Sequence, residues 1–425
     1  MRRARRDQSP IVRILSPLRD FLDTEASAAT LIAGSAVAAL IWANSPWGGS
    51  YEHLWDSRAA VSIAGHTLEL DLRHWVNDGL MSIFFLVVGL EIKREVTDGH
   101  LASRRASLLP GAAALGGMLV PIALYLAIAG STAPRGWAIP MATDIALAVG
   151  ILAVAGDRIP ASLRAFLLGL AIVDDIGAIV VIAVAYSASV RVGWILLAGL
   201  GAVAAVVCKR AGVYATPVYV VIGCFIWFSL HEGNIHPTLA GVAMGLLAPT
   251  TPRLQPELID VEALADVSDV GAARETTELA RGSVSVVEWL QHVLHPWASF
   301  AIVPLFALAN SGIRISVDGI ADAARSPITW GVFVGLVAGK PLGVVLATRT
   351  TIRLGLADQP PDAAPRQVLG IGAAAGIGFT VALFITELAF SDPDDRSNAT
   401  LGILLASVVA AAASSAVLRT AERAP

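Results

Sequence analysis

Long apolar segments recur along almost all of this 425-residue chain, and they limit what it can fold into. Many approach the roughly 20 residues that a helix needs to cross a bilayer. Charged residues make up 15% of the chain, against about 25% in an average soluble domain. The sequence therefore predicts an all-α polytopic membrane protein and excludes an ordinary soluble enzyme. The twelve predicted spans are 27–43, 75–89, 105–130, 137–155, 163–186, 192–208, 217–230, 237–249, 290–310, 330–347, 368–390 and 400–418.

The basic residues predict how these spans are oriented. Of the 30 Lys and Arg, 22 fall on the side of the amino terminus, seven fall on the other side, and Lys340 lies inside a span. Because Lys and Arg accumulate in cytoplasmic loops, both termini are expected in the cytoplasm. Residues 1–26 then form a basic cytoplasmic segment without a cleaved signal, and 419–425 form a cytoplasmic tail. A net charge of −4 gives no indication of nucleic-acid binding.

Two connections between spans stand out. Residues 61–72 alternate apolar with smaller or polar side chains around Gly65 and His66, which is typical of a short external β-hairpin; a structureless loop fits this signal equally well. Residues 251–288 hold eight acids and three arginines, and they predict a solvated cytoplasmic connector without chemistry of its own. This connector divides the membrane part into 27–250, with eight spans, and 289–418, with four.

Four ionisable residues lie deep inside predicted spans: Asp144, Asp174, Asp175 and Lys340. Each costs about 2.5–3.5 kcal/mol to insert, so each is a candidate functional residue. One alternative is a static buried network that holds helices together. Against it, three carboxylates exceed one ammonium, and two acids are left needing a cation or protons. Carboxylate oxygens bind hard cations such as Na⁺ and Li⁺ as well as protons, and this competition is the chemical basis of cation/proton exchange.

Two spans are predicted to be broken helices. In the fourth span, Pro140 comes four residues before Asp144. In the eleventh span, Thr380 follows a run of glycines at 370, 372, 376 and 378. Unwound backbone inside a membrane exposes carbonyl groups and helix ends, from which transporters build ion sites. The spacing also allows an inverted repeat that relates the third to fifth spans to the tenth to twelfth. Glycines used only for close helix packing explain either segment alone, but both together less well.

Other titratable residues lie near span ends. Glu91 and Glu95 share a helix face beside Arg94, which is consistent with a cation funnel or a pH-sensitive cluster; spacing alone favours a solvated helix end. His236 and His292 could titrate near neutral pH, although a lone histidine is more often a plain hydrogen-bonding residue. The two cysteines, Cys208 and Cys224, fit small apolar filler.

Several separated motifs together resemble the NhaA-type sodium/proton antiporter family. In their expected order they span nearly the whole chain, from about residue 20 to 418. The motifs are GLEIKRE at 89–95, ATDIA at 142–146, VDDIGA at 173–178, HPTLAG at 236–241, LHPW at 294–297, PLFALAN at 304–310, GKPLG at 339–343 and GIGFT at 376–380.

The resemblance implies a transporter of the bacterial plasma membrane. It implies twelve helices with an inverted repeat, two broken helices that cross at mid-membrane, and exchange of cytoplasmic Na⁺ or Li⁺ for external protons without a cofactor. The external hairpin would be the contact of a homodimer. The roles it implies for matching positions are Asp175 as principal cation and proton carrier, Asp174 as partner of Lys340, Asp144 and Thr143 at the first break, Gly376, Gly378 and Thr380 at the second, and Glu91, Arg94, Glu95, His236 and His292 in a pH response.

The chain also departs from the family pattern. Gln291 precedes His292 where the family often has Glu, which removes one titratable carboxylate from the proposed sensor, and the acidic connector is longer than usual. Three other classes fit less well. An intramembrane aspartyl protease leaves Lys340 unexplained, a symporter of organic anions lacks an arginine at membrane depth, and a channel more usually shows rings of charge or a filter.

Overall fold

The structure is a computed structural model that describes residues 25–63, 66–99, 101–155, 159–187, 189–213, 215–252, 282–359 and 363–420. The predicted terminal segments, apart from their inner ends, and most of the predicted connector at 251–288 lie outside these residues. The first half of the chain forms α2 (Glu25–Ala43), α3 (Gly48–Trp55), β1 (Arg58–Ile63), β2 (His66–Asp71), α4 (Leu72–His74), η1 (Trp75–Leu80), α5 (Met81–Thr97), α6 (Arg104–Ala129), η2 (Pro134–Met141), α7 (Ile145–Ala155), α8 (Ala161–Ala185) and α9 (Val192–Arg210). The second half forms α10 (Thr216–Glu232), α11 (Leu239–Leu247), α13 (Val286–Trp297), η5 (Ala298–Ile302), α14 (Val303–Asn310), α15 (Val317–Arg325), α16 (Pro327–Val334), η6 (Gly335–Gly339), α17 (Lys340–Arg353), α18 (Pro365–Ala375), α19 (Phe379–Ala389) and α20 (Pro393–Thr420).

The prediction of a polytopic helical protein is confirmed, and the count of twelve crossing helices is confirmed only in part. Each predicted span contains a helix. Within the described residues, however, nine helical segments are long and apolar enough to cross a membrane, or ten if the bent pair α18 and α19 counts as one span. The 17 residues of α10 and the nine of α11 fall below this length. At about 1.5 Å per residue, α11 covers less than half of a bilayer core.

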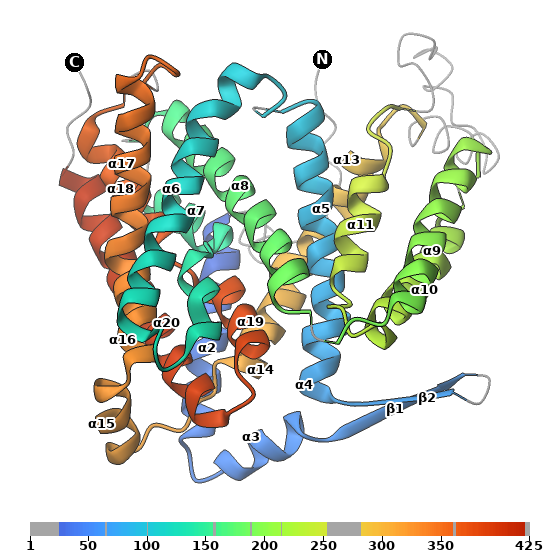
Figure 1. Cartoon of the computed structure of the whole chain (residues 1–425), viewed down its shortest axis with the longest axis horizontal. Helices are drawn as coiled ribbons and strands as arrows, with labels where there is room; N and C mark the ends of the chain where they lie inside the picture. Colours follow the sequence, from blue (N-terminus) through green and yellow to red (C-terminus); the bar gives the residue numbers. More distant parts are fainter. Residues whose placement is uncertain are drawn as a thin grey trace, which may run out of the picture.

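The predicted hairpin is confirmed and begins three residues earlier than expected. Strands β1 and β2 pair antiparallel from Arg58 opposite Asp71 to Ile63 opposite His66. The Asp71 carboxylate then accepts a hydrogen bond of 2.7 Å from the His74 amide, which caps α4, so that the second strand leads directly into the helix. In Figure 1 the hairpin extends sideways from the helices.

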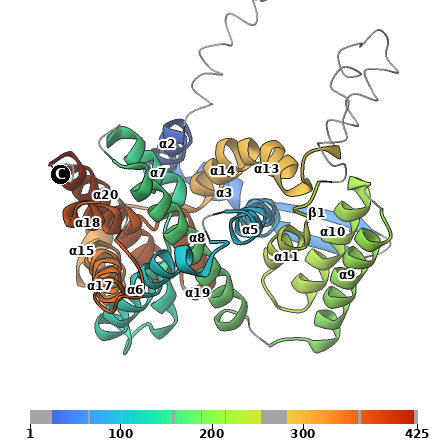
Figure 2. The same cartoon turned by 90° about the horizontal axis from the view of Figure 1, so that it is seen from above.

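The molecule has two opposite faces. The hairpin face carries α3, the hairpin and α15; the termini face is the opposite side, where α2 begins and α20 ends (Figure 1). Seen from above, α9, α10 and α11 lie on one side of the molecule, and α6, α17, α18 and α20 lie on the other (Figure 2). Helices α5 and α8 run between these two groups.

Glycines allow α6 and α17 to pack backbone against backbone. A Cβ added at Gly343 would lie 2.1 Å from the Gly116 carbonyl oxygen, and one at Gly116 would lie 2.3 Å from the Gly343 oxygen. Close approach through small residues is the usual way in which membrane helices associate. The contact lies one turn from Lys340 at the start of α17, so it fixes where that side chain enters the bundle.

Replacing Gly343 by Ala is expected to lower the stability of the detergent-solubilised protein by about 1–3 kcal/mol, because the added methyl forces two backbones apart. The measurement is the shift of the thermal unfolding midpoint. Gly34→Ala is the matched control, since nothing lies within 4 Å of a Cβ there. Equal midpoints for the two variants would show that this backbone contact is not required.

Candidate functional site

Two helix interruptions meet inside the bundle. The first, at 142–144, separates η2 from α7, and the second, at 376–378, separates α18 from α19, which are bent by 43° relative to each other. The Asp144 amide donates to the Ile377 carbonyl oxygen at 2.6 Å, and the Thr143 hydroxyl lies 2.9 Å from the Ala375 carbonyl oxygen. Both interruptions fall where the sequence predicts broken helices. Polar groups of one interruption form hydrogen bonds with the backbone of the other, as unwound chain in a membrane requires.

Asp144 binds the first turns of two helices at once. Its Oδ1 accepts from the Leu147 amide at 3.1 Å, and its Oδ2 accepts from both the amide (3.1 Å) and the hydroxyl (2.6 Å) of Thr380. Leu147 belongs to the first turn of α7 and Thr380 to the first turn of α19. A carboxylate at this position stabilises the positive ends of both helix dipoles. Asp144 thus lies at the meeting point of these two helix ends.

Lys340 and Asp174 form a buried ion pair between α17 and α8, with both side chains fully inaccessible. The Lys340 ammonium also donates to the Thr143 hydroxyl at 2.8 Å, and that hydroxyl lies 2.6 Å from Asp174 Oδ2. A hydroxyl has one hydrogen, so Thr143 serves either Asp174 or the Ala375 carbonyl at any moment. The charged acceptor makes the stronger bond. Thr143 thus links the first interruption to the ion pair.

Asp175, the next residue on α8, points elsewhere and has no partner. Within the described part of the chain, its side chain makes no hydrogen bond or ion pair, and only 7% of the residue is exposed. Asp174 Oδ1 is also buried without a partner. Because adjacent residues of a helix project about 100° apart, Asp174 and Asp175 cannot both face Lys340. The site thus combines a compensated carboxylate with an uncompensated one.

The charge balance decides which chemistry the site can perform. Asp144, Asp174 and Asp175 are buried together with one cation, Lys340. An unpaired buried carboxylate is unstable unless a proton or a metal cation compensates it. No group of three or more His, Cys, Asp or Glu side chains in the described residues is arranged to hold a metal ion. The uncompensated carboxylate of Asp175 can be balanced by a proton or by a hard cation, which prefers oxygen ligands.

Four of the five residues of the predicted pH response lie on α5 and α13, and the fifth, His236, lies elsewhere. Glu91, Arg94 and Glu95 lie on the last turns of α5, toward the termini face, where Glu95 is buried and Arg94 is exposed. His292 is exposed on α13, which packs against α5. Glu91, Arg94 and Glu95 therefore lie together at the end of α5, and His292 lies on a helix that packs against it.

His236 lies at the other end of the molecule, between α10 and α11. Its ring packs edge-on against Phe384 at 5.5 Å, and its Nδ1 is buried without a hydrogen-bond partner. Desolvation lowers the pKa of His236 to about 4, so the imidazole is neutral at neutral pH in this conformation. A role in the pH response would require a conformation in which the ring is hydrated.

Several buried or half-buried polar residues at the hairpin face were not predicted. Asp78 lies in η1, Asn77 and Asn310 exchange hydrogen bonds of 3.2 and 2.8 Å, and Glu387 pairs with Arg396 at 3.0 Å. All lie within a few residues of a predicted span end, where a polar side chain is expected to be solvated. The signal that could have found them is the run of two adjacent polar residues, Asn77 and Asp78, just inside a span.

Comparison with known proteins places these observations in a family. The model of the family "Na+/H+ antiporter 1" matches residues 19–418. "Na(+)/H(+) antiporter NhaA 2" of Sorangium cellulosum is 42% identical over 421 residues, which cover 96% of this chain and 90% of that protein. The protein of the same name in Myxococcus xanthus is 44% identical, with 93% and 87% covered. "Na(+)/H(+) antiporter NhaA 3" of Frankia alni is 42% identical, with 96% and 89% covered.

Proposed function

This chain belongs to the Na⁺/H⁺ antiporter 1 family, whose members are membrane transporters rather than enzymes, and from that premise we propose how its ion site works. We propose that it exchanges cytoplasmic Na⁺ or Li⁺ for external protons by alternating access, with both ions competing for Asp175 and Asp174. The observation that carries this proposal is the pair of neighbouring carboxylates, one bound to Lys340 and one without a partner, at the meeting point of two interrupted helices. The transported ions are substrates, and no cofactor takes part.

The cycle follows from exclusion between the two ions. In the state open to the cytoplasm, Asp175 releases its proton and takes up Na⁺ together with Asp174. The site then opens to the outside, where protons displace the ion, and the protonated site returns. Because the carboxylates compensate either a metal ion or protons but not both, each turnover couples the two fluxes.

Lys340 gives the cycle a route to net charge movement. Asp174 can bind Na⁺ only if its ion pair with Lys340 loosens, and an ammonium left unpaired in a buried site favours release of its proton. More than one proton then moves for each Na⁺, and the exchange is electrogenic. Thr143 supports this step, since its hydroxyl contacts both members of the pair.

The same family membership motivates four further proposals. Both termini lie in the cytoplasm of a bacterial-type plasma membrane, as the distribution of Lys and Arg predicts. Two copies assemble through the β-hairpin, which projects from the bundle with exposed strands. Glu91, with Arg94, Glu95 and His292 nearby, supplies the pH response. The inverted repeat and the crossing of the broken helices at mid-membrane are proposed on the same grounds.

The function is tested in inverted membrane vesicles that carry an imposed proton gradient and a fluorescent pH reporter. Adding Na⁺ or Li⁺ is expected to collapse the gradient, because each ion taken up on the cytoplasmic face releases protons from the vesicle lumen. Choline at the same concentration is the control for ionic strength. If neither Na⁺ nor Li⁺ acts at any pH from about 6.5 to 9, the proposed exchange is wrong; a requirement for an organic solute would indicate a symporter instead.

A further inference from the structure

A second polar cavity, of about 530 Å³, lies at the hairpin face and is separate from the ion site. Its walls come from α4 and η1, the residues that follow α8, the connection between α10 and α11, and the second half of α19. Oxygen-bearing side chains are frequent in this wall, among them Asp78, Asn234, Tyr186 and Glu387. Nothing in the proposed ion exchange at Asp175 uses these residues.

Asp78 is the unexplained group in this wall. Only 9% of the residue is exposed, and within the described residues its carboxylate has no hydrogen-bond or ion-pair partner. The backbone around it is fixed, because its carbonyl oxygen accepts from the Ser82 hydroxyl and, at 2.9 Å, from the Trp227 indole. A buried carboxylate held in place without a partner leaves negative charge that a cation can compensate.

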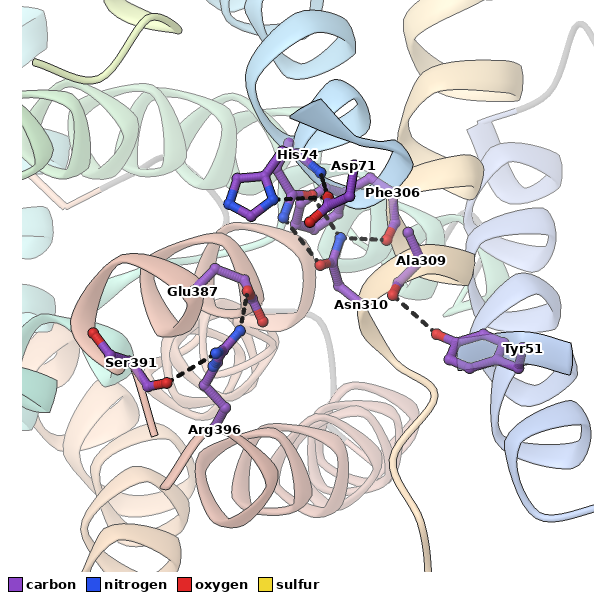
Figure 3. Close-up of polar contacts among 10 residues, drawn as sticks. Tyr51, Asp71, His74, Phe306, Ala309, Asn310, Glu387, Ser391 and Arg396 are labelled. Carbon is purple, nitrogen blue, oxygen red and sulfur yellow. Dashed lines mark hydrogen bonds and ion pairs between the residues drawn. The ribbon is translucent and has the colours of Figure 1, made fainter. Parts of the chain in front are cut away.

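The neighbouring polar groups are committed elsewhere. The ring of His74 contacts the Asp71 carboxylate at 2.7 Å, and Arg396 donates to Glu387 and to the Ser391 carbonyl oxygen, each at 3.0 Å (Figure 3). Asn77 exchanges its side-chain hydrogen bonds with Asn310. His74 and Asp71 act on Asp78 only through their charge. The His74 ring and the Arg396 guanidinium are therefore engaged with acids other than Asp78.

Aromatic rings separate this cavity from the ion site. Phe384 forms part of the cavity wall and packs against the His236 ring. Its ring centroid lies 5.4 Å from that of Phe85 and 6.2 Å from that of Phe306. Thr380, which binds Asp144, lies one turn earlier on α19 than Phe384, and Glu387 lies about one turn beyond it. At 1.5 Å per residue, Glu387 is about 10 Å from Thr380 along the helix axis. None of the residues that line the cavity belongs to the ion site, so the two are distinct places.

We infer that this cavity is a second cation station, in which Asp78, with Glu387 as the neighbouring acid, holds one small hard cation such as Na⁺ or Li⁺ at the hairpin face. Oxygen ligands and uncompensated negative charge are the features that such ions select. The station would concentrate cations at the mouth of the pathway on this side and is not itself the exchange site. Its role in transport rests on the proposed function, whereas its binding of a cation does not.

The station is tested by measuring how its charge acts on a nearby thiol. Cys208 and Cys224 are replaced by Ala, and Leu388, which lines the cavity, is replaced by Cys as a reporter. In the full-length solubilised protein, the reporter is reacted with a cationic and with an anionic thiosulfonate reagent. Asp78→Asn is expected to lower the ratio of the cationic to the anionic rate on the order of fivefold, because it removes one negative charge from the wall of the same cavity. Glu387→Gln is expected to lower it less, because Arg396 already balances that acid.

Binding of Na⁺ is measured by the same ratio of reaction rates in the protein that retains Asp78. Replacing choline by Na⁺ at constant ionic strength is expected to lower the ratio along a saturating curve, and Asp78→Asn is expected to abolish the saturation. Asp318→Asn, which removes an exposed charge from α15 on the same face, is the matched control and should change neither quantity. A ratio insensitive to Asp78→Asn, or an identical response to Na⁺ and choline, would overturn the station.

These outcomes are independent of the ion site. A second set of measurements carries Asp175→Asn, which removes the proposed carrier. The Na⁺ response of the reporter should persist in that variant if the cavity binds its own cation, and its loss would show that the response comes from the ion site. Failure of exchange in vesicles together with an intact reporter response would contradict the proposed function alone.

Discussion

Replacing Asp175 by Asn is expected to abolish Na⁺/H⁺ exchange, because the amide is nearly isosteric with the carboxylate but neither binds a proton nor offers a negative charge to Na⁺. At a separation of 4 Å in a partly buried site, one charge pair is worth about 4 kcal/mol, which corresponds to a loss of more than about 100-fold in apparent affinity. Neither of the two other buried aspartates at the site is expected to replace it, because Asp174 alone must also balance Lys340 and Asp144 binds two helix ends. The measurement is the initial rate of Na⁺-dependent proton movement in inverted vesicles.

The control for this variant is Asp322→Asn, which removes an exposed carboxylate from α15. It should exchange ions at the unsubstituted rate, whereas Asp175→Asn should be inactive although it is present in the membrane at the same level. Exchange by the Asp175 variant at more than about a tenth of the unsubstituted rate would refute the assignment of the carrier.

Replacing Lys340 by Met is expected to destabilise the protein by about 3–5 kcal/mol, because it leaves Asp174 as a buried charge without a partner. Met has a similar volume and flexibility, so that the lost charge rather than a cavity dominates the change. The measurement is the shift in the thermal unfolding midpoint of the purified protein in detergent.

A double variant separates the charge effect from a packing effect. Asp174→Asn combined with Lys340→Met leaves no unpaired charge at this position, and the double variant should recover most of the stability that Lys340→Met loses, although it should not transport. Strictly additive losses in the two single variants and the double variant would show that the ion pair contributes nothing through its charge.

The parts of the molecule that could be predicted from its sequence are those in which a local rule has few exceptions. An ionisable residue amid apolar neighbours is costly, so Asp174 and Lys340 stood out as candidates, and the structure places them in contact. The same reasoning identified both helix interruptions from Pro140 and from the glycines before Thr380. The alternating pattern indicated the hairpin, although the polar residues at its ends did not show where the strands begin and end.

Other features depended on contacts that no local rule supplies. The Thr143 hydroxyl joins two helices through partners 31 and 232 residues away in the sequence. Asp78 was overlooked because it lies close to a span boundary, where a charge is ordinarily solvated; only the packing of α5 against distant segments shows that it is buried. The short helix α11 was predicted as a full span because hydropathy alone does not indicate where a helix ends.

The most direct test of competition at the paired aspartates is the apparent KM for Na⁺ as a function of pH in proteoliposomes. If Na⁺ and protons exclude each other from the same carboxylates, KM should rise by about tenfold for each unit by which the pH falls below the titration of the site, and by more if two protons compete. The maximal rate at saturating Na⁺ should change little over that range. A KM that stays constant while the maximal rate falls would contradict the account, because it would place protons and Na⁺ at separate sites.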